Sequence, residues 1–140
     1  MKPWVTYAIL SMIFAGFTSV IAKLGLAGIS GELGLAVRTC FVFVMVLAFA
    51  SLAVPVSQWS TLTRDNYLWL GLSGLTTSLS WIFYYKALKD GEVSTIALID
   101  KGSMVVAVLL AFFILKEQIT IKTLFGGTLM VAGLLIIARK

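Results

Sequence analysis

The stretch Val93-Ser-Thr-Ile-Ala-Leu-Ile-Asp-Lys-Gly-Ser-Met-Val-Val-Ala-Val-Leu-Leu-Ala-Phe-Phe-Ile-Leu115 decides the fold class of this protein. It is long and apolar enough to cross the hydrocarbon core of a bilayer, which takes about 20 mostly apolar residues. Asp100 and Lys101 nevertheless place two adjacent opposite charges inside it. Such a charge costs at least a few kcal/mol unless it faces a partner, a protein interior or a water-filled cavity. The stretch therefore predicts a membrane helix that carries a functional site, with a structural ion pair as the alternative.

The composition of the whole chain supports a membrane protein. Its 140 residues are 60% hydrophobic and only 12% charged, and the mean hydropathy is +1.04. A soluble domain of this size needs far less apolar surface. The chain has no histidine and a single cysteine, Cys40, and we see no metal-ligand spacing or catalytic constellation. We therefore expect no enzyme, no metal and no cofactor, and the thinly spread net charge of +5 does not favour nucleic-acid binding.

Hydrophobic segments of membrane-spanning length recur along the chain. The expected spans are residues 4–22, 33–54, 67–85, 93–115 and 121–138. We interpret the first as a retained span, because no small-x-small cleavage site follows it. Asp65 and Asn66 are expected to cap the third span. The loops are short, so neighbouring helices should be antiparallel, and the prediction is one five-helix domain over residues 1–140.

The basic residues near the span ends are nearly balanced between the two sides of the membrane. The first side carries Lys2, Arg64, Lys116 and Lys122, and the second carries Lys23, Lys86, Lys89, Arg139 and Lys140. The richer side is usually cytoplasmic, so this weak bias leans towards an external N-terminus and is compatible with insertion in both orientations. Many carriers consist of two inverted repeats. An antiparallel homodimer of this chain would supply ten helices with that symmetry.

Small residues in the last span are candidates for the dimer contact. Gly126, Gly127 and Gly133 would let another helix backbone approach closely. Contact with a second protomer and ordinary packing within the chain both remain open.

The fourth span holds the first group of candidate substrate-binding residues. Asp100 and Lys101 lie about 11 Å into the helix, and at least one of them is expected to have a further partner. Gly102 weakens the helix at this point, and Ser103 offers a hydroxyl. We expect a local helix break that lines a cavity.

Arg38, Trp81 and Tyr84 are the remaining candidate substrate-binding residues. Arg38 could clamp a carboxylate or phosphate, reach the membrane surface, or pair with Asp100. Trp81, Tyr84 and Tyr85 share one helix face; Trp81 suits a cavity wall, and Tyr85 suits the aromatic belt at the interface. Lys23 is expected to extend to the membrane surface.

Several segments together resemble one EamA-type repeat of the drug/metabolite transporter superfamily, over nearly the whole chain. They are Ile21-Ala-Lys-Leu-Gly25, Ala36-Val-Arg-Thr39, Trp81-Ile-Phe-Tyr-Tyr-Lys-Ala-Leu-Lys-Asp-Gly91, Leu115-Lys-Glu-Gln-Ile-Thr120 and Leu124-Phe-Gly-Gly-Thr-Leu-Met-Val-Ala-Gly133. Most members look like two fused repeats, and this chain is similar to the small five-span bacterial and archaeal branch. The resemblance implies an all-α membrane protein forming one half of a ten-helix inverted-repeat transporter.

Two departures from related proteins limit what the resemblance implies. The first helix lacks the membrane-embedded glutamate of the four-span multidrug resistance proteins, so proton-coupled export of cationic drugs is not implied. The proline-containing stretch that is usual in the fourth helix reads Asp100-Lys-Gly-Ser103 here.

The sequence thus predicts a multi-pass protein of a prokaryotic inner membrane. It would transport a small polar metabolite, anionic or zwitterionic, by alternating access as an antiparallel homodimer. The alternative is a non-transporting assembly protein or a subunit of a larger membrane complex, in which the polar residues would hold helices together.

Overall fold

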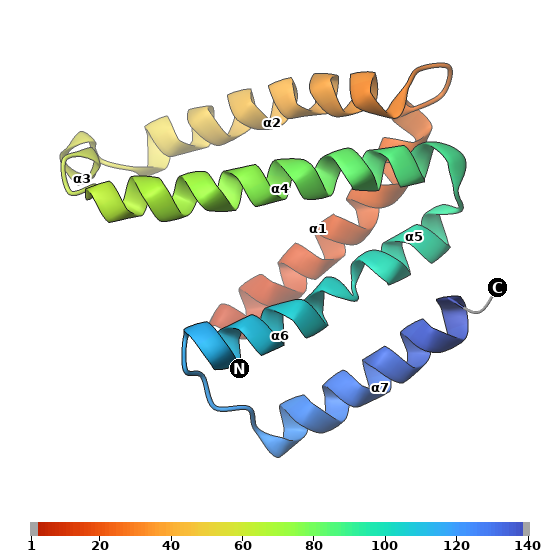
Figure 1. The fold of residues 1–140 in the computed structure, drawn as a ribbon. Helices are drawn as coiled ribbons and strands as arrows, with labels where there is room; N and C mark the ends of the chain where they lie inside the picture. The colour runs from red at the N-terminus through yellow and green to blue at the C-terminus, as the bar shows by residue number, and fades with distance from the viewer. Residues whose placement is uncertain (1–2, 139–140) are drawn as a thin grey trace. The chain divides into compact units, whose positions relative to one another are not determined.

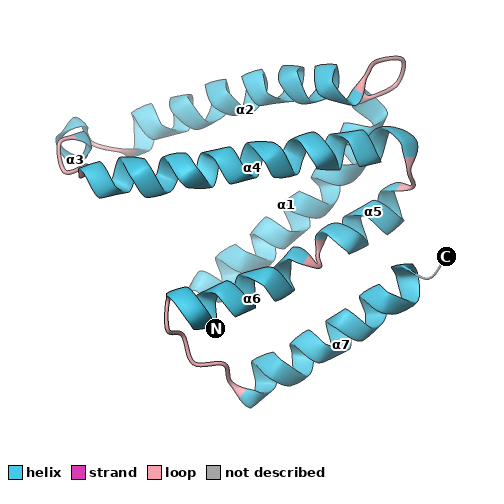
Figure 2. Cartoon of the chain, in the orientation of Figure 1, coloured by secondary structure: helices cyan, strands magenta, loops and turns pink. Residues whose placement is uncertain are grey.

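The computed structural model describes residues 3–138, and within them every regular element is a helix and no strand occurs (Figures 1 and 2). The helices are α1 (Pro3–Gly25), α2 (Gly31–Ala53), α3 (Val56–Trp59), α4 (Arg64–Asp90), α5 (Val93–Asp100), α6 (Ser103–Ile114) and α7 (Ile121–Ala138). The predicted all-α class is confirmed. Lys2, Arg139 and Lys140, which contribute to the predicted bias in orientation, lie outside the described residues.

Three segments among the described residues are long and apolar enough to cross a membrane: α1, α2 and the stretch Val93–Ile114. Most of the large hydrophobic side chains are exposed. A surface of this kind requires lipid or another protein around it. In the described part of the chain, the buried hydrophobic residues are only Leu26, Tyr85 and Leu88. The expected spans at 67–85 and 121–138 are helical but are not among these three segments, so the five-span arrangement stays a prediction.

The chain forms two compact units, whose boundaries fall inside α1 and between α4 and α5. The α2/α4 unit comprises Ile21–Asp90, and the α5–α7 unit comprises residues 3–20 and 91–138 of the described chain. In the α2/α4 unit, the two long helices run side by side (Figure 1). The α5–α7 unit holds the broken helix of the fourth predicted span and α7.

Side-chain caps explain where α2 and α4 begin. The Ser30 hydroxyl accepts a hydrogen bond from the Leu33 N–H at 3.2 Å. Thr63 and Asn66 bond reciprocally: the Asn66 Oδ1 accepts from the Thr63 N–H at 2.9 Å, and the Thr63 Oγ1 accepts from the Asn66 N–H at 3.3 Å. This is the geometry of a capping box. The prediction that Asp65 and Asn66 precede the helix was therefore wrong, because Thr63 is the capping residue and α4 begins at Arg64.

Two lysines donate hydrogen bonds to backbone carbonyls at one end of the α2/α4 unit. The Lys23 Nζ donates to the Leu88 carbonyl at 2.6 Å and to the Lys89 carbonyl at 3.0 Å, where the last turn of α4 leaves carbonyls without helical partners. The Lys89 Nζ donates to the Leu26 carbonyl at 3.2 Å. These carbonyls bind the ammonium group of Lys23, and its extension to the membrane surface stays a prediction.

Candidate functional site

Arg38 and Trp81 meet where α2 packs beside α4. The guanidinium carbon of Arg38 lies 4.4 Å from the centroid of the Trp81 ring and 5.8 Å from that of Tyr85. Both distances fall within the range of cation–π attraction. Arg38 lies about 10 Å along α2 from its start at Gly31, so this charge is deep in a helix that is apolar enough to cross a membrane.

The Arg38 guanidinium has unused hydrogen-bonding capacity. Its Nη1 is buried and has no hydrogen-bond partner, while the residue as a whole is half-buried. Within the α2/α4 unit, Glu32 pairs with Lys86 at 3.5 Å, and no carboxylate of this unit forms an ion pair with Arg38. The aromatic rings contact the guanidinium, and its N–H groups remain available to an acceptor.

The two tyrosines beside Trp81 differ from each other in exposure. Tyr85 is only 4% exposed, so the prediction that it joins an aromatic belt at the membrane interface was wrong. Tyr84 is half-buried, and its ring centroid lies 6.3 Å from that of Tyr85 in a tilted arrangement. The buried ring of Tyr85 thus lies next to the guanidinium group of Arg38.

In the α5–α7 unit, the predicted helix break is present between Asp100 and Ser103. Backbone hydrogen bonds there join residues three apart: Lys101 N–H to Leu98 O at 3.1 Å, Gly102 N–H to Ile99 O at 2.8 Å, and Val105 N–H to Gly102 O at 3.0 Å. This tighter pattern often marks a functional hinge inside a helix. A Cβ atom at Gly102 would lie 3.0 Å from the Ile99 carbonyl oxygen and 3.4 Å from a methyl group of Leu134 on α7. Glycine therefore fits this crowded turn.

Asp100 and Lys101 pair with each other at the break. The Lys101 Nζ lies 3.6 Å from the Asp100 Oδ2, and the side chains are 55% and 38% exposed, respectively. The expected further partner is not found among the described residues, because the long flexible lysine stem curves back to its neighbour. Ser103 begins α6 and is exposed. The ions of the pair and the Ser103 hydroxyl are thus accessible from outside the protomer.

Comparison with known proteins gives the family of this chain. Residues 2–139 match the EamA-like transporter family. The chain belongs to this family. A Sinorhizobium sp. protein, named an uncharacterized transporter in the cobO 3′ region, is 33% identical over an alignment 140 positions long, which covers 98% of this chain and 97% of the relative. No solved structure matches. The predicted resemblance is confirmed, and membership of a transporter family agrees with the prediction that the protein is not an enzyme.

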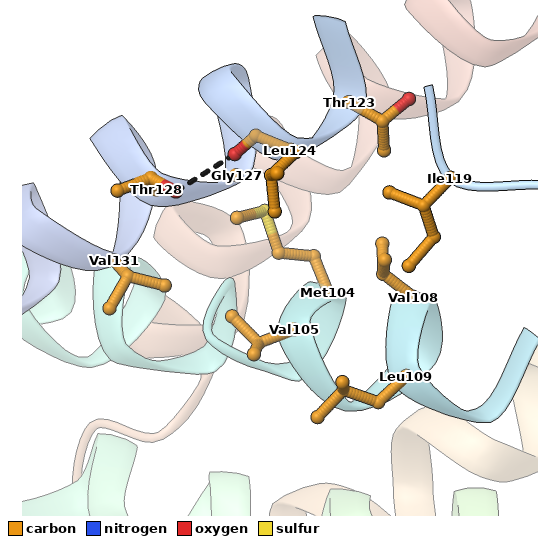
Figure 3. Close-up of a pocket in the computed structure, with 10 residues that line it drawn as sticks. All are labelled: Met104, Val105, Val108, Leu109, Ile119, Thr123, Leu124, Gly127, Thr128 and Val131. Carbon is orange, nitrogen blue, oxygen red and sulfur yellow. Dashed lines mark hydrogen bonds between the residues drawn. The ribbon is translucent and has the colours of Figure 1, made fainter. Parts of the chain in front are cut away.

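The EamA-like chain also has an apolar groove between α6 and α7 (Figure 3). Its volume is about 250 Å³, and no charged residue lines it. The lining residues are Met104, Val105, Val108, Leu109, Ile119, Thr123, Leu124, Gly127, Thr128 and Val131. The Thr128 hydroxyl donates to the Leu124 carbonyl of its own helix at 2.9 Å. The groove therefore suits an apolar group and not a charged solute.

The α7 glycines of the EamA-like chain are open on the protomer. A Cβ atom at Gly126, Gly127 or Gly133 would meet nothing within 4 Å. Tight packing within the chain therefore does not require glycine at these positions. The finding favours contact with a second protomer, which stays a prediction.

Replacing Gly133 by Leu is expected to shift the proposed dimer of the purified EamA-like protein to a monomer in detergent. The added side chain would keep a partner helix from approaching α7 closely, and we expect the dimer dissociation constant to rise about tenfold or more, equivalent to about 1.4 kcal/mol. Size-exclusion chromatography with light scattering over a dilution series measures this change. Gly16→Leu is the matched control, since Gly16 on α1 is equally open. If Gly127→Leu and Gly133→Leu both remain dimeric, the contact lies elsewhere.

Proposed function

We propose that this protein carries a small polar metabolite across a prokaryotic inner membrane by alternating access, as an antiparallel homodimer of five-span protomers. Membership of the EamA-like transporter family over residues 2–139 supports transport. The observation that carries the proposal is the broken helix at Asp100 and Lys101, inside the membrane-spanning stretch Val93–Ile114. Irregular backbone at membrane depth is tolerated where it is buried in protein or lines a water-filled cavity, and discontinuous helices form the substrate sites of many carriers.

The exposure of the ion pair supports a cavity or a partner at the break. Lys101 and Asp100 are partly exposed on the protomer, yet charges at this depth avoid lipid tails. In the membrane they must therefore face water or another protein surface. A transporter dimer offers both, because its substrate pathway lies between the repeats.

The small number of buried side chains supports a dimer. Leu26, Tyr85 and Leu88 are the buried hydrophobic residues of the described chain, so the isolated protomer has little interior in which to enclose a substrate. A second copy in the opposite orientation would complete the inverted-repeat arrangement. The near-balance of basic residues around the helices is compatible with such insertion.

Labelling from each side of the membrane tests the antiparallel arrangement. Single cysteines are introduced as Ala27→Cys and Gln58→Cys in a Cys40→Ser background, at exposed positions in the turn between α1 and α2 and on the short helix α3 between α2 and α4. Each cysteine should react with an impermeant maleimide in roughly half of the molecules, and in the rest only after permeabilisation, because the basic bias is too weak to fix one orientation. If one site reacts completely from outside and the other only from inside, the antiparallel homodimer is excluded.

A ligand screen followed by transport measurement tests the activity itself. Small polar solutes that raise the unfolding midpoint of the purified dimer bind its folded state. At least one of them should then exchange across liposomes that contain the protein, and not across protein-free liposomes. A folded dimer that binds such solutes but moves none of them would contradict transport and favour the assembly-subunit alternative.

A further inference from the structure

Arg38 carries an unneutralised charge in the interior of the α2/α4 unit. It is the only charged residue between positions 33 and 53, and positions 67–85 contain none. Glu32 is paired with Lys86 at the end of the helix pair. A cation at this depth is costly without a counter-charge or water, so the missing anion calls for a source outside the unit.

The geometry of Arg38 indicates what kind of anion is missing. Trp81 and Tyr85 attract the guanidinium through their ring faces, and these contacts satisfy no N–H donor. The Nη1 group is buried without an acceptor, although buried donors are paired in most native structures. A planar array of five donors matches the paired oxygens of a carboxylate or phosphate better than a halide ion.

We propose that Arg38 binds the carboxylate or phosphate group of the transported solute, and that Trp81 holds the guanidinium in place for it. This assignment rests on the proposed function and makes the substrate an oxyanion. It places recognition of the oxyanion on α2 and α4, in addition to the candidate residues of the fourth predicted span. Trp81 acts as a positioning residue, because its contact is with Arg38.

Thermal unfolding of the purified dimer in detergent, at constant ionic strength, tests the binding of an oxyanion. The probes are inorganic phosphate and acetate, with acetamide as the neutral analogue of acetate. The variants are Arg38→Gln and Arg38→Lys, the second of which keeps the charge and loses the planar fork. Arg64→Gln is the matched control, since Arg64 is exposed at the start of α4 and its replacement removes the same charge.

We expect phosphate or acetate, and not acetamide, to raise the unfolding midpoint of the wild-type protein and of Arg64→Gln. Arg38→Gln should lower the affinity for the anion about tenfold or more, in keeping with the loss of charge-assisted hydrogen bonds. Arg38→Lys should retain part of this affinity. Trp81→Leu should lower the affinity for the anion about two- to fivefold through loss of the cation–π contact. An equal anion-induced shift in Arg38→Gln, or no shift in the wild type, would overturn the proposal.

Two other sources of the anion give different results. A lipid phosphate would produce an Arg38-dependent shift with phosphatidylglycerol and none with either soluble anion. A carboxylate of the second protomer would make Arg38→Gln monomeric in the absence of any probe. Either result overturns the assignment of Arg38 to the substrate.

The outcome for Arg38 can be separated from the outcome for transport. If liposomes exchange only cationic or neutral solutes and Arg38→Gln does so at the wild-type rate, the oxyanion assignment fails and the transport function stands. If the wild-type dimer binds phosphate or acetate through Arg38 but exchanges no solute, the transport function fails, and with it the assignment of the anion as a transported substrate.

Discussion

Replacing Lys101 by Met is expected to abolish solute exchange in liposomes while leaving a folded dimer. Methionine keeps the length and apolar stem of lysine and removes the charge that the helix break presents. The loss of stability should be small, about 0–1 kcal/mol, because the pair with Asp100 is loose and partly exposed and such pairs contribute little. Exchange of a solute from the ligand screen, measured beside the unfolding midpoint, reads out both effects.

Two further variants show what the Lys101 result means. Lys122→Met is the matched control, because Lys122 is an exposed lysine at the start of α7, and it should exchange solute normally. If Lys101→Met lowers the free energy of unfolding by about 3–5 kcal/mol and Asp100→Asn restores it, the lysine serves the ion pair and not the substrate. A folded Lys101→Met protein that exchanges solute at the wild-type rate contradicts any role for this residue in the site.

Helix positions could be predicted from sequence because a bilayer demands long apolar runs. The predicted span 121–138 coincides with α7, and the break at Gly102 follows from the poor helix propensity of glycine and the crowding at this turn. The end of α4 could not be predicted, because charged residues such as Lys86 and Lys89 after an apolar run are typical of a loop. In the structure they lie in its last turns, where Glu32 pairs with Lys86 and the Leu26 carbonyl accepts from Lys89.

The contact between Arg38 and Trp81 was missed, although both residues were candidates. Carboxylates and the membrane surface were the predicted surroundings of Arg38, because opposite charge is the feature that a sequence displays most directly. The available signal was depth. Arg38 lies about 8 Å inside the start of the predicted span 33–54, and Trp81 lies about 6 Å inside the end of the predicted span 67–85. An antiparallel pair of helices brings positions of similar depth close together.

Gly31→Ala is expected to destabilise the α2/α4 unit and to disturb the Arg38 site. A Cβ atom at Gly31 would lie 2.7 Å from the Tyr85 carbonyl oxygen and 3.0 Å from its carbon. Both are backbone atoms, so the strain cannot be relieved by a change of rotamer. Overpacking of this kind typically costs about 1–3 kcal/mol, and α2 would have to move away from α4.

Gly71→Ala separates overpacking at this contact from the general effect of alanine in a helix. A Cβ atom at Gly71 on α4 meets nothing within 4 Å, so its replacement should raise the unfolding midpoint, in line with a gain of up to about 1 kcal/mol from helix propensity. The two alanine variants are thus expected to shift the midpoint in opposite directions.

Gly31→Ala should also weaken the binding of an anion to Arg38, whereas Gly71→Ala should not. The reason is that the backbone carbonyl which the new methyl group would push belongs to Tyr85, whose ring contacts the Arg38 guanidinium. Equal midpoints for Gly31→Ala and the wild type would show that α2 and α4 do not approach at this point, and the support for the Arg38 site would be lost with that contact.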